Sequence, residues 1–188
     1  MSARPSSRQR LLDVASDLFY REGIRAISMD AIVEKSGVSK ATLYRHFPSK
    51  DDLIAAYLEA HEHHIWEHFD EAILKHEGSP KAELTSLVDA VVELFKPEYY
   101  RGCPFLNAFA EFSNANHPAH RLALDYNLAL RAKILQICQK AGKMDESWPE
   151  QLLLVINGAY SSIPVLGLTK SANQLKKIAV QMINQYLD

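Results

Sequence analysis

Two short helical segments joined by a tight turn, within residues 28–50, restrict most strongly what this chain can fold into. Ser28 is a good N-cap for the first segment, and Ser39 is a good N-cap for the second. The second segment ends before Pro48, because a residue that precedes proline is pushed out of the helical region. The turn Gly37-Val38-Ser39 separates the two segments. Short helices at this spacing predict a helix-turn-helix unit.

The rest of the chain also shows helical spacing of apolar residues, and no segment alternates with the period of two of a strand. The pattern predicts helices over residues 7–22, 49–76, 119–141 and 171–187, and further helices that begin at Pro80, near Phe105 and near Trp148. We therefore expect an all-α fold of about nine helices. Pro164 is expected to kink or end its helix, since proline cannot donate a backbone hydrogen bond.

Charge is distributed unevenly along the 188 residues. Residues 1–50 hold nine Lys and Arg against five Asp and Glu, so this segment is +4 while the remainder is −6. A basic end on an acidic body suits a chain that presents one end to phosphate. We expect a DNA-binding domain over residues 1–50 and a second domain over residues 51–188.

The sequence predicts a cytoplasmic protein with no membrane partner. No stretch approaches the roughly 20 apolar residues that span a bilayer, and the basic, polar first ten residues are unlike a signal peptide. The two cysteines, Cys103 and Cys138, are too few for a disulfide framework or a zinc site. A redox or electrophile sensor at Cys103, beside Arg101, is the alternative to an ordinary structural thiol.

The outward residues of the second short helix are the expected DNA contacts. In a helix-turn-helix that helix enters the major groove, and the first helix crosses the sugar-phosphate backbone. Apolar Val38, Leu43 and Phe47 are then expected to face inward. The expected base readers are Lys40, Thr42, Arg45 and His46. The expected phosphate clamps, which fix register without reading sequence, are Ser28, Ser39, Tyr44 and Lys50.

Residues 8–55 resemble the N-terminal domain of the TetR family of repressors. The resemblance rests on Phe19 and Gly23, Gly37-Val38-Ser39, Thr42-Leu43-Tyr44-x-His46-Phe47, and Ser49-Lys50 followed by Leu53. One departure is Val33, where many members carry alanine and where the two short helices approach closely. The resemblance implies double-stranded, palindromic operator DNA as a partner, and repression as the usual mode.

The resemblance also implies a homodimer built through the last two long helices, and a small-molecule effector bound by the helices before them. Several apolar residues of the last two helices, such as Leu152, Ile156, Leu175 and Ile178, are compatible with such a dimer. The aromatic residues that suit an apolar or aromatic effector are Trp66, Phe69, Phe105, Phe109, Phe112 and Tyr126.

Two other functions compete with an effector-controlled repressor. One is a constitutive DNA-binding protein with no effector. The other is a metal-dependent enzyme that uses His61, His64 and His68, which share one helix face. No partnered nucleophile or known catalytic spacing accompanies these histidines, so we expect no enzyme, no catalytic residue, no metal site and no cofactor.

Overall fold

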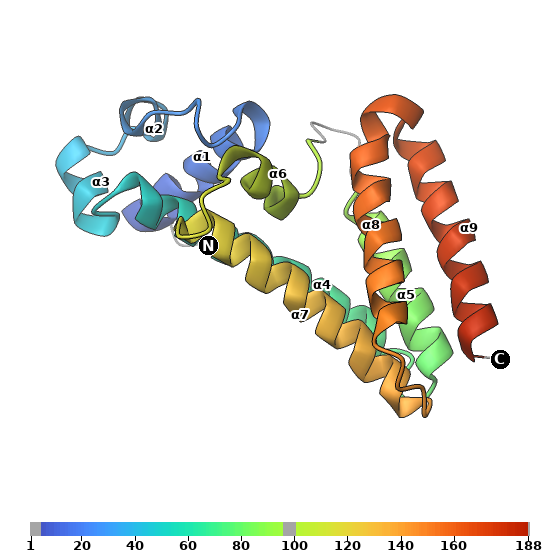
Figure 1. Cartoon of the computed structure of the whole chain (residues 1–188). Coiled ribbons are helices and arrows are strands. Elements are labelled where there is room, and N and C mark those ends of the chain that lie inside the picture. The colour runs from blue at the N-terminus through green and yellow to red at the C-terminus, as the bar shows by residue number, and fades with distance from the viewer. Residues whose placement is uncertain (1–4, 96–100, 188) are drawn as a thin grey trace. The chain divides into compact units, whose positions relative to one another are not determined.

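The computed structural model describes residues 5–95 and 101–187. Within this part of the chain the fold is all-α, with nine helices and no strand, as the sequence predicts (Figure 1). The helices are α1 (Ser7–Glu22), α2 (Met29–Ser36), α3 (Lys40–His46), α4 (Lys50–Leu74), α5 (Pro80–Glu93), α6 (Pro104–Glu111), α7 (Pro118–Lys140), α8 (Ser147–Leu166) and α9 (Leu168–Leu187).

Local side-chain caps explain where α2, α3 and α4 begin. The Ser28 hydroxyl oxygen accepts a hydrogen bond from a backbone N–H in the first turn of α2, and Ser39 does the same for α3. Ser49 and Asp52 form a reciprocal capping box, in which each side chain accepts from the other residue's backbone N–H. Gly37 ends α2 in the left-handed conformation, with φ 64°.

Pro164 does not end α8 where it stands. The helix continues through the proline for two more residues to Leu166, and Gly167 (φ 80°) then closes it. Proline lacks only its own N–H, so the carbonyls nearer the end can still accept, and the N–H of Gly167 bonds to the carbonyl of Ile163.

The chain forms two compact units, each with its own core. The first comprises the described residues up to Glu62 together with Pro104–Leu124. Here α1 packs against α2 and α3. Its most deeply buried side chains are Leu11, Phe19, Ile32, Leu43, Phe47, Leu53, Tyr57 and Phe105. Residues 51–62 thus share a compact unit with the helix-turn-helix, and the predicted domain boundary at residue 50 stays a prediction.

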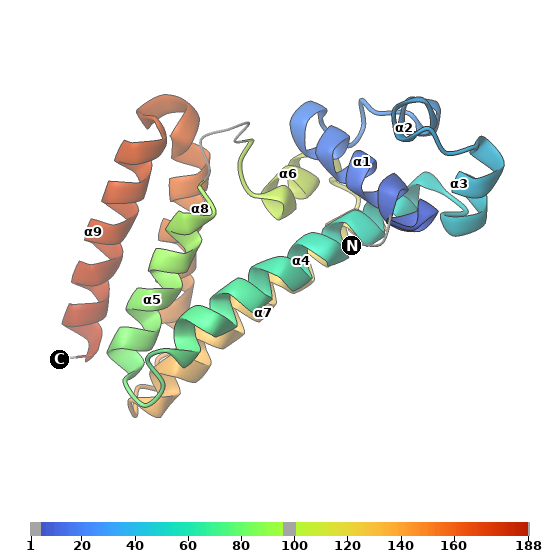
Figure 2. The ribbon, with the colours of Figure 1, turned by 180° about the vertical axis from the view of Figure 1, so that it is seen from behind.

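The second unit comprises the described residues from His63 to Cys103 and from Asp125 onward. Helices α5, α8 and α9 pack side by side in it, as both views show (Figures 1 and 2). Its core contains Phe69, Leu84, Leu87, Val91, Ile134, Leu152, Ile156, Leu175, Ala179 and Ile183. These residues form the inward stripes of amphipathic helices, so the packing follows the apolar periodicity of the sequence.

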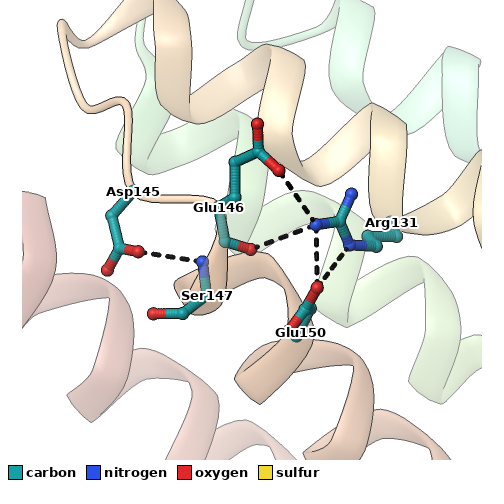
Figure 3. Close-up of polar contacts among 5 residues, drawn as sticks. All are labelled: Arg131, Asp145, Glu146, Ser147 and Glu150. Carbon is teal, nitrogen blue, oxygen red and sulfur yellow. Dashed lines mark hydrogen bonds and ion pairs between the residues drawn. The ribbon is translucent and has the colours of Figure 1, made fainter.

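A cluster of polar contacts fixes the start of α8 on α7 (Figure 3). The Arg131 guanidinium donates hydrogen bonds of 3.0 and 2.8 Å to one carboxylate oxygen of Glu150, and its Nη2 also lies 3.5 Å from a carboxylate oxygen of Glu146. Asp145 accepts from the backbone N–H of Ser147 at 2.8 Å. These hydrogen bonds raise the pKa of Arg131 and lower the pKa of Asp145.

Among the residues that the structure describes, none of the helices is both long enough and apolar enough to cross a membrane.

Candidate nucleic-acid interface

Helices α2 and α3 carry most of the predicted contact residues, which differ in their exposure. Val38, Leu43 and Phe47 are 5%, 0% and 2% exposed, which confirms that they face inward. Lys40, Tyr44 and Arg45 are exposed, whereas Thr42 and His46 are half-buried. Phe47 is extended (φ −135°, ψ 92°), as expected for a residue before proline. The α3 helix therefore presents a polar side to solvent above an apolar anchor.

The exposed cations of α3 differ in their partners. The Lys40 ammonium donates to a carboxylate oxygen of Asp30 at 2.7 Å, and this hydrogen bond raises the pKa of Lys40. Arg45 makes no ion pair with any residue that the structure describes. A guanidinium with no competing carboxylate can offer all its donors to a guanine edge or a phosphate.

The serine hydroxyls at the start of α2 and α3 already act as caps. Ser28 accepts from Ala31 at 3.1 Å, and Ser39 accepts from Thr42 at 3.2 Å. The Ser39 hydroxyl also donates to the Thr42 hydroxyl at 2.9 Å. Both serines are exposed, and a hydroxyl can accept and donate at the same time. The Ser28 hydroxyl can therefore still donate to a phosphate while it caps α2. The one hydrogen of the Ser39 hydroxyl is donated to Thr42, so a phosphate contact requires Ser39 to exchange the Thr42 hydroxyl for a phosphate oxygen.

Lys50, the first residue of α4, is bonded within the first unit. Its ammonium donates to the carbonyl of Arg25 at 3.4 Å and lies 5.9 Å from the centroid of the Phe19 ring. Burial lowers the pKa of Lys50, because desolvation disfavours its charged form. The side chain is half-buried rather than fully extended into solvent, so a phosphate contact requires it to exchange the Arg25 carbonyl for a phosphate oxygen.

Two features beside the interface were not found by sequence reasoning. The guanidinium of exposed Arg8 lies 5.1 Å from the centroid of the Phe47 ring, so α1 adds a cation next to the end of α3. The carboxylate of Glu111, on α6, accepts from the backbone N–H groups of Ile24 and Arg25. No local pattern indicates either contact, because the partners are far apart in the sequence.

The predicted effector-binding aromatics divide between the two units. Trp66, Phe69 and Tyr126 belong to the second unit, where the Trp66 ring lies 5.8 Å from Phe69 and 6.2 Å from Tyr126. Phe69 and Tyr126 are 0% and 4% exposed, and Trp66 is half-buried.

Phe105, Phe109 and Phe112 belong to the first unit. Phe105 is fully buried, while the other two contact histidine rings: Phe109 lies 4.9 Å from His120, and Phe112 stacks on His117 at 4.1 Å. The six residues are therefore not a single aromatic cluster within either unit.

The second unit also has a surface cleft of about 470 Å³, which is lined by charged rather than aromatic side chains. Its lining is mainly charged: Glu67, Asp70, Glu71, Glu77, Glu83, Lys133 and Lys140, with Ile73 and Leu74. Lys133 bonds to Asp70 and Lys140 bonds to Glu83, at 2.7 and 2.8 Å. None of the predicted aromatics lines this cleft.

The helix α4 histidines have separate surroundings. His61 lies between the rings of Tyr20 and Tyr57, His64 is exposed, and His68 approaches Glu93 at 3.2 Å. Within residues 5–95 and 101–187, no three His, Cys, Asp or Glu side chains are grouped so that they could hold a metal ion.

The N-terminal part of this chain is similar in sequence to known bacterial regulators. Residues 11–57 match the family model described as bacterial regulatory proteins, tetR family. The regulator AcrR of Shigella flexneri is 34% identical over 87 residues, which are 46% of this chain and 40% of that protein. The transcriptional activator FasR of Mycolicibacterium smegmatis is 45% identical over 58 residues, which are 31% of this chain and 26% of that protein. This chain thus matches less than half the length of either regulator.

A solved structure is similar over almost the whole chain. The TetR-family regulator SCO4454 of Streptomyces coelicolor has a TM-score of 0.92 and 26% identity, with 98% of this chain and 92% of that chain covered. The similarity therefore includes the helices that follow the helix-turn-helix, where the sequence carries no diagnostic motif.

Proposed function

Because this chain belongs to the TetR family of transcriptional regulators, we propose that it is a homodimeric repressor that binds a palindromic DNA operator and leaves it when a small apolar or aromatic effector binds. The observation that carries the DNA-binding part is the polar side of α3. Lys40, Tyr44 and Arg45 are exposed there over the buried anchors Leu43 and Phe47.

We assign DNA roles according to position on this face. Lys40, Thr42, Arg45 and His46 lie on α3, which enters the major groove in a helix-turn-helix, and they read base edges. The phosphate contacts are Ser28, Ser39, Tyr44 and Lys50, which lie at or beside helix starts or carry a donor of suitable reach.

An exposed apolar stripe on α8 supports the dimer. Leu154 and Val165 are 72% and 84% exposed, and the small residues Gly158 and Ser161 lie between them at helical spacing. On α9, Ile178 and Val180 are 40% and 37% exposed. A second copy of the same helices would bury Leu154 and Val165 around a two-fold axis, which palindromic half-sites require. Ile178 and Val180 are two residues apart and lie on different sides of α9, so such an interface would cover one of them.

The effector part of the proposal rests on α4. This helix carries Lys50 at its first residue and Trp66 further along. A ligand that displaces the aromatic contacts of Trp66 with Phe69 and Tyr126 would move the helix that begins at the DNA contact. Such a ligand would release DNA only to the extent that it binds the state with a displaced α4 more tightly than the DNA-binding state. Phe105, Phe109 and Phe112, which belong to the first unit, stay predicted effector contacts.

Selection of DNA bound by the full chain from a random library tests the proposal. The expected product is an inverted repeat whose half-site centres lie roughly 34 Å, or a multiple of that, apart. Failure to enrich any sequence would refute sequence-specific binding. Enrichment of a single half-site would refute the symmetric dimer.

A constitutive DNA-binding protein is the second candidate, and the burial of the aromatics favours it. Phe69, Phe105 and Tyr126 are at most 4% exposed, so they already pack as a core does. A panel of small aromatic compounds, assayed for release of the selected operator, distinguishes the two. An unchanged affinity with every compound would support constitutive binding.

A further inference from the structure

Asp30 and Lys40 form an ion pair that joins the two helices of the helix-turn-helix. Asp30 is in the first turn of α2, and Lys40 is the first residue of α3. The Lys40 ammonium lies 2.7 Å from a carboxylate oxygen of Asp30, and the two side chains are 58% and 70% exposed. The pair is therefore open to solvent on the elements that carry the proposed DNA contacts.

Stability of the fold does not account for this pair. Exposed ion pairs contribute little to folding, because water screens the charges and two long side chains lose freedom. A carboxylate in the first turn of α2 is also unfavourable for DNA binding, since α2 crosses the phosphate backbone in a helix-turn-helix. A carboxylate at Asp30 would repel nearby phosphates and neutralise a cation that could bind them.

The donor geometry of lysine suggests what the pair does instead. An ammonium has three donors, and Asp30 takes one of them. The remaining donors can reach acceptors on a base edge while the pair stays intact. A phosphate, by contrast, competes with the carboxylate for the same charge. The carboxylate thus penalises phosphate contact more than base contact.

We propose that Asp30 determines DNA specificity, by holding Lys40 toward base edges and withholding it from phosphates. Asp30 is a positioning residue, and it acts through Lys40. This inference rests on the proposed sequence-specific DNA binding and adds to it. The Asp30 carboxylate is therefore expected to weaken binding to random DNA and to leave binding to the operator nearly unchanged.

The test compares wild type with Asp30→Asn on the selected operator and on random duplex DNA across a salt series. We expect Asp30→Asn to bind random DNA about tenfold more tightly, which narrows the ratio of operator to random affinity. The plot of log affinity against log salt for random DNA should become steeper by about one, because one more cation then displaces counterions. Asp30→Glu, which restores a carboxylate, should return both quantities toward wild type.

A double-mutant cycle with Lys40→Ala separates positioning from simple repulsion. If Asp30 acts through Lys40, Asp30→Asn should leave random-DNA affinity unchanged in the Lys40→Ala background. An equal increase in both backgrounds would overturn the inference, since the carboxylate would then only repel DNA. Glu59→Gln is the matched control, because it removes the same charge from an exposed position on α4 of the same unit.

Two further outcomes distinguish this inference from the proposed function. Wild type that shows no preference for any DNA sequence would refute the proposed function itself. If wild type binds DNA specifically but Asp30→Asn changes neither the ratio of operator to random affinity nor the salt slope, only the role of Asp30 is refuted. Thermal unfolding of each variant checks that the helices remain folded.

Discussion

The carboxylate of Glu111 accepts a hydrogen bond of 2.7 Å from the backbone N–H of Arg25, a residue 86 positions earlier in the chain. The other carboxylate oxygen accepts from Ile24 at 3.1 Å. Gly23 lies beside them with φ 96°, and an added Cβ there would sit 3.5 Å from the carboxylate. The end of α6 thus holds the segment between α1 and α2 within one compact unit.

Loss of the Glu111 carboxylate should loosen this segment. We expect Glu111→Ala to lower the free energy of unfolding by about 1–3 kcal/mol, because two backbone donors lose a charged acceptor. Operator affinity should fall as well, since Arg25 also supplies the carbonyl that binds Lys50. Urea denaturation and DNA titration measure the two effects. Ser113→Ala, an exposed change two residues further on, is the control. Equal unfolding energies for the two variants would contradict the role of Glu111.

Arg45 and Lys50 should affect DNA binding in different ways. Arg45→Ala is expected to relax the preference at one base position and to cost about 1–3 kcal/mol on the preferred operator. Lys50→Ala should weaken all sequences alike and reduce the steepness of the salt dependence by about one. Repeating the library selection and the salt series on both variants separates these effects. A Lys50→Ala variant with a new base preference and the wild-type salt slope would refute the phosphate assignment.

How far the sequence predicts this structure depends on the range of the contact. The starts of α2 and α3 are predictable because Ser28 and Ser39 cap backbone groups within three residues. The pairs Asp30–Lys40 and Glu111–Arg25 are not, since they depend on how helices pack.

Apolar periodicity has a similar limit. It shows which residues lie on one helix face, but not what covers that face. The α8 residues Leu152 and Ile156 were candidates for a dimer surface, yet they are 0% and 1% exposed inside the second unit. Leu154, which is not among the dimer residues predicted from the sequence, is 72% exposed. Only the packing of α8 against α9 makes that distinction.

A charge placed on the exposed stripe of α8 should prevent dimerisation. Leu154→Glu would bury a carboxylate in the apolar dimer interface. The second copy offers apolar side chains there, which cannot offset the cost of removing the charge from water. We expect the variant to be a folded monomer by light scattering and to lose high-affinity binding to the full palindrome. Met144→Glu is the matched control, since Met144 is 71% exposed but lies outside α8. A Leu154→Glu variant that remains dimeric would place the interface elsewhere.

The buried thiol of Cys138 should make stability depend on alkaline pH. Burial raises the pKa of Cys138 from 9.0 to about 11, because desolvation disfavours the thiolate. The native state then holds its proton more tightly than the unfolded state, so the stabilisation is complete below pH 9 and is lost as pH rises toward 11. The loss is at most about 2–3 kcal/mol. Urea denaturation at several pH values should show a shallower decline for Cys138→Ala than for wild type. Identical declines would contradict the assignment.

The ion pair between Lys140 and Glu83 should matter more to folding than the exposed pairs do. Glu83 is fully buried, and its carboxylate accepts from Lys140 at 2.8 Å and from the backbone N–H of Gly78 at 3.1 Å. Lys140→Ala removes the only ionic partner that the described residues give this carboxylate. We expect a loss of about 2–4 kcal/mol in the free energy of unfolding, since the partner left behind is a buried charge.

The double variant Glu83→Gln with Lys140→Ala shows which effect destabilises Lys140→Ala. One effect is the cost of leaving the Glu83 carboxylate buried without a partner, and the other is the loss of an attractive contact. The neutral amide costs less to bury than an unpaired carboxylate, so the double variant should be more stable than Lys140→Ala alone. Lys176→Ala provides the comparison with an exposed pair, because Lys176 and its partner Asp89 are each 46% exposed. That variant should lose less than about 1 kcal/mol. A Lys140→Ala loss no larger than this would mean that water reaches the Glu83 carboxylate once the lysine is gone.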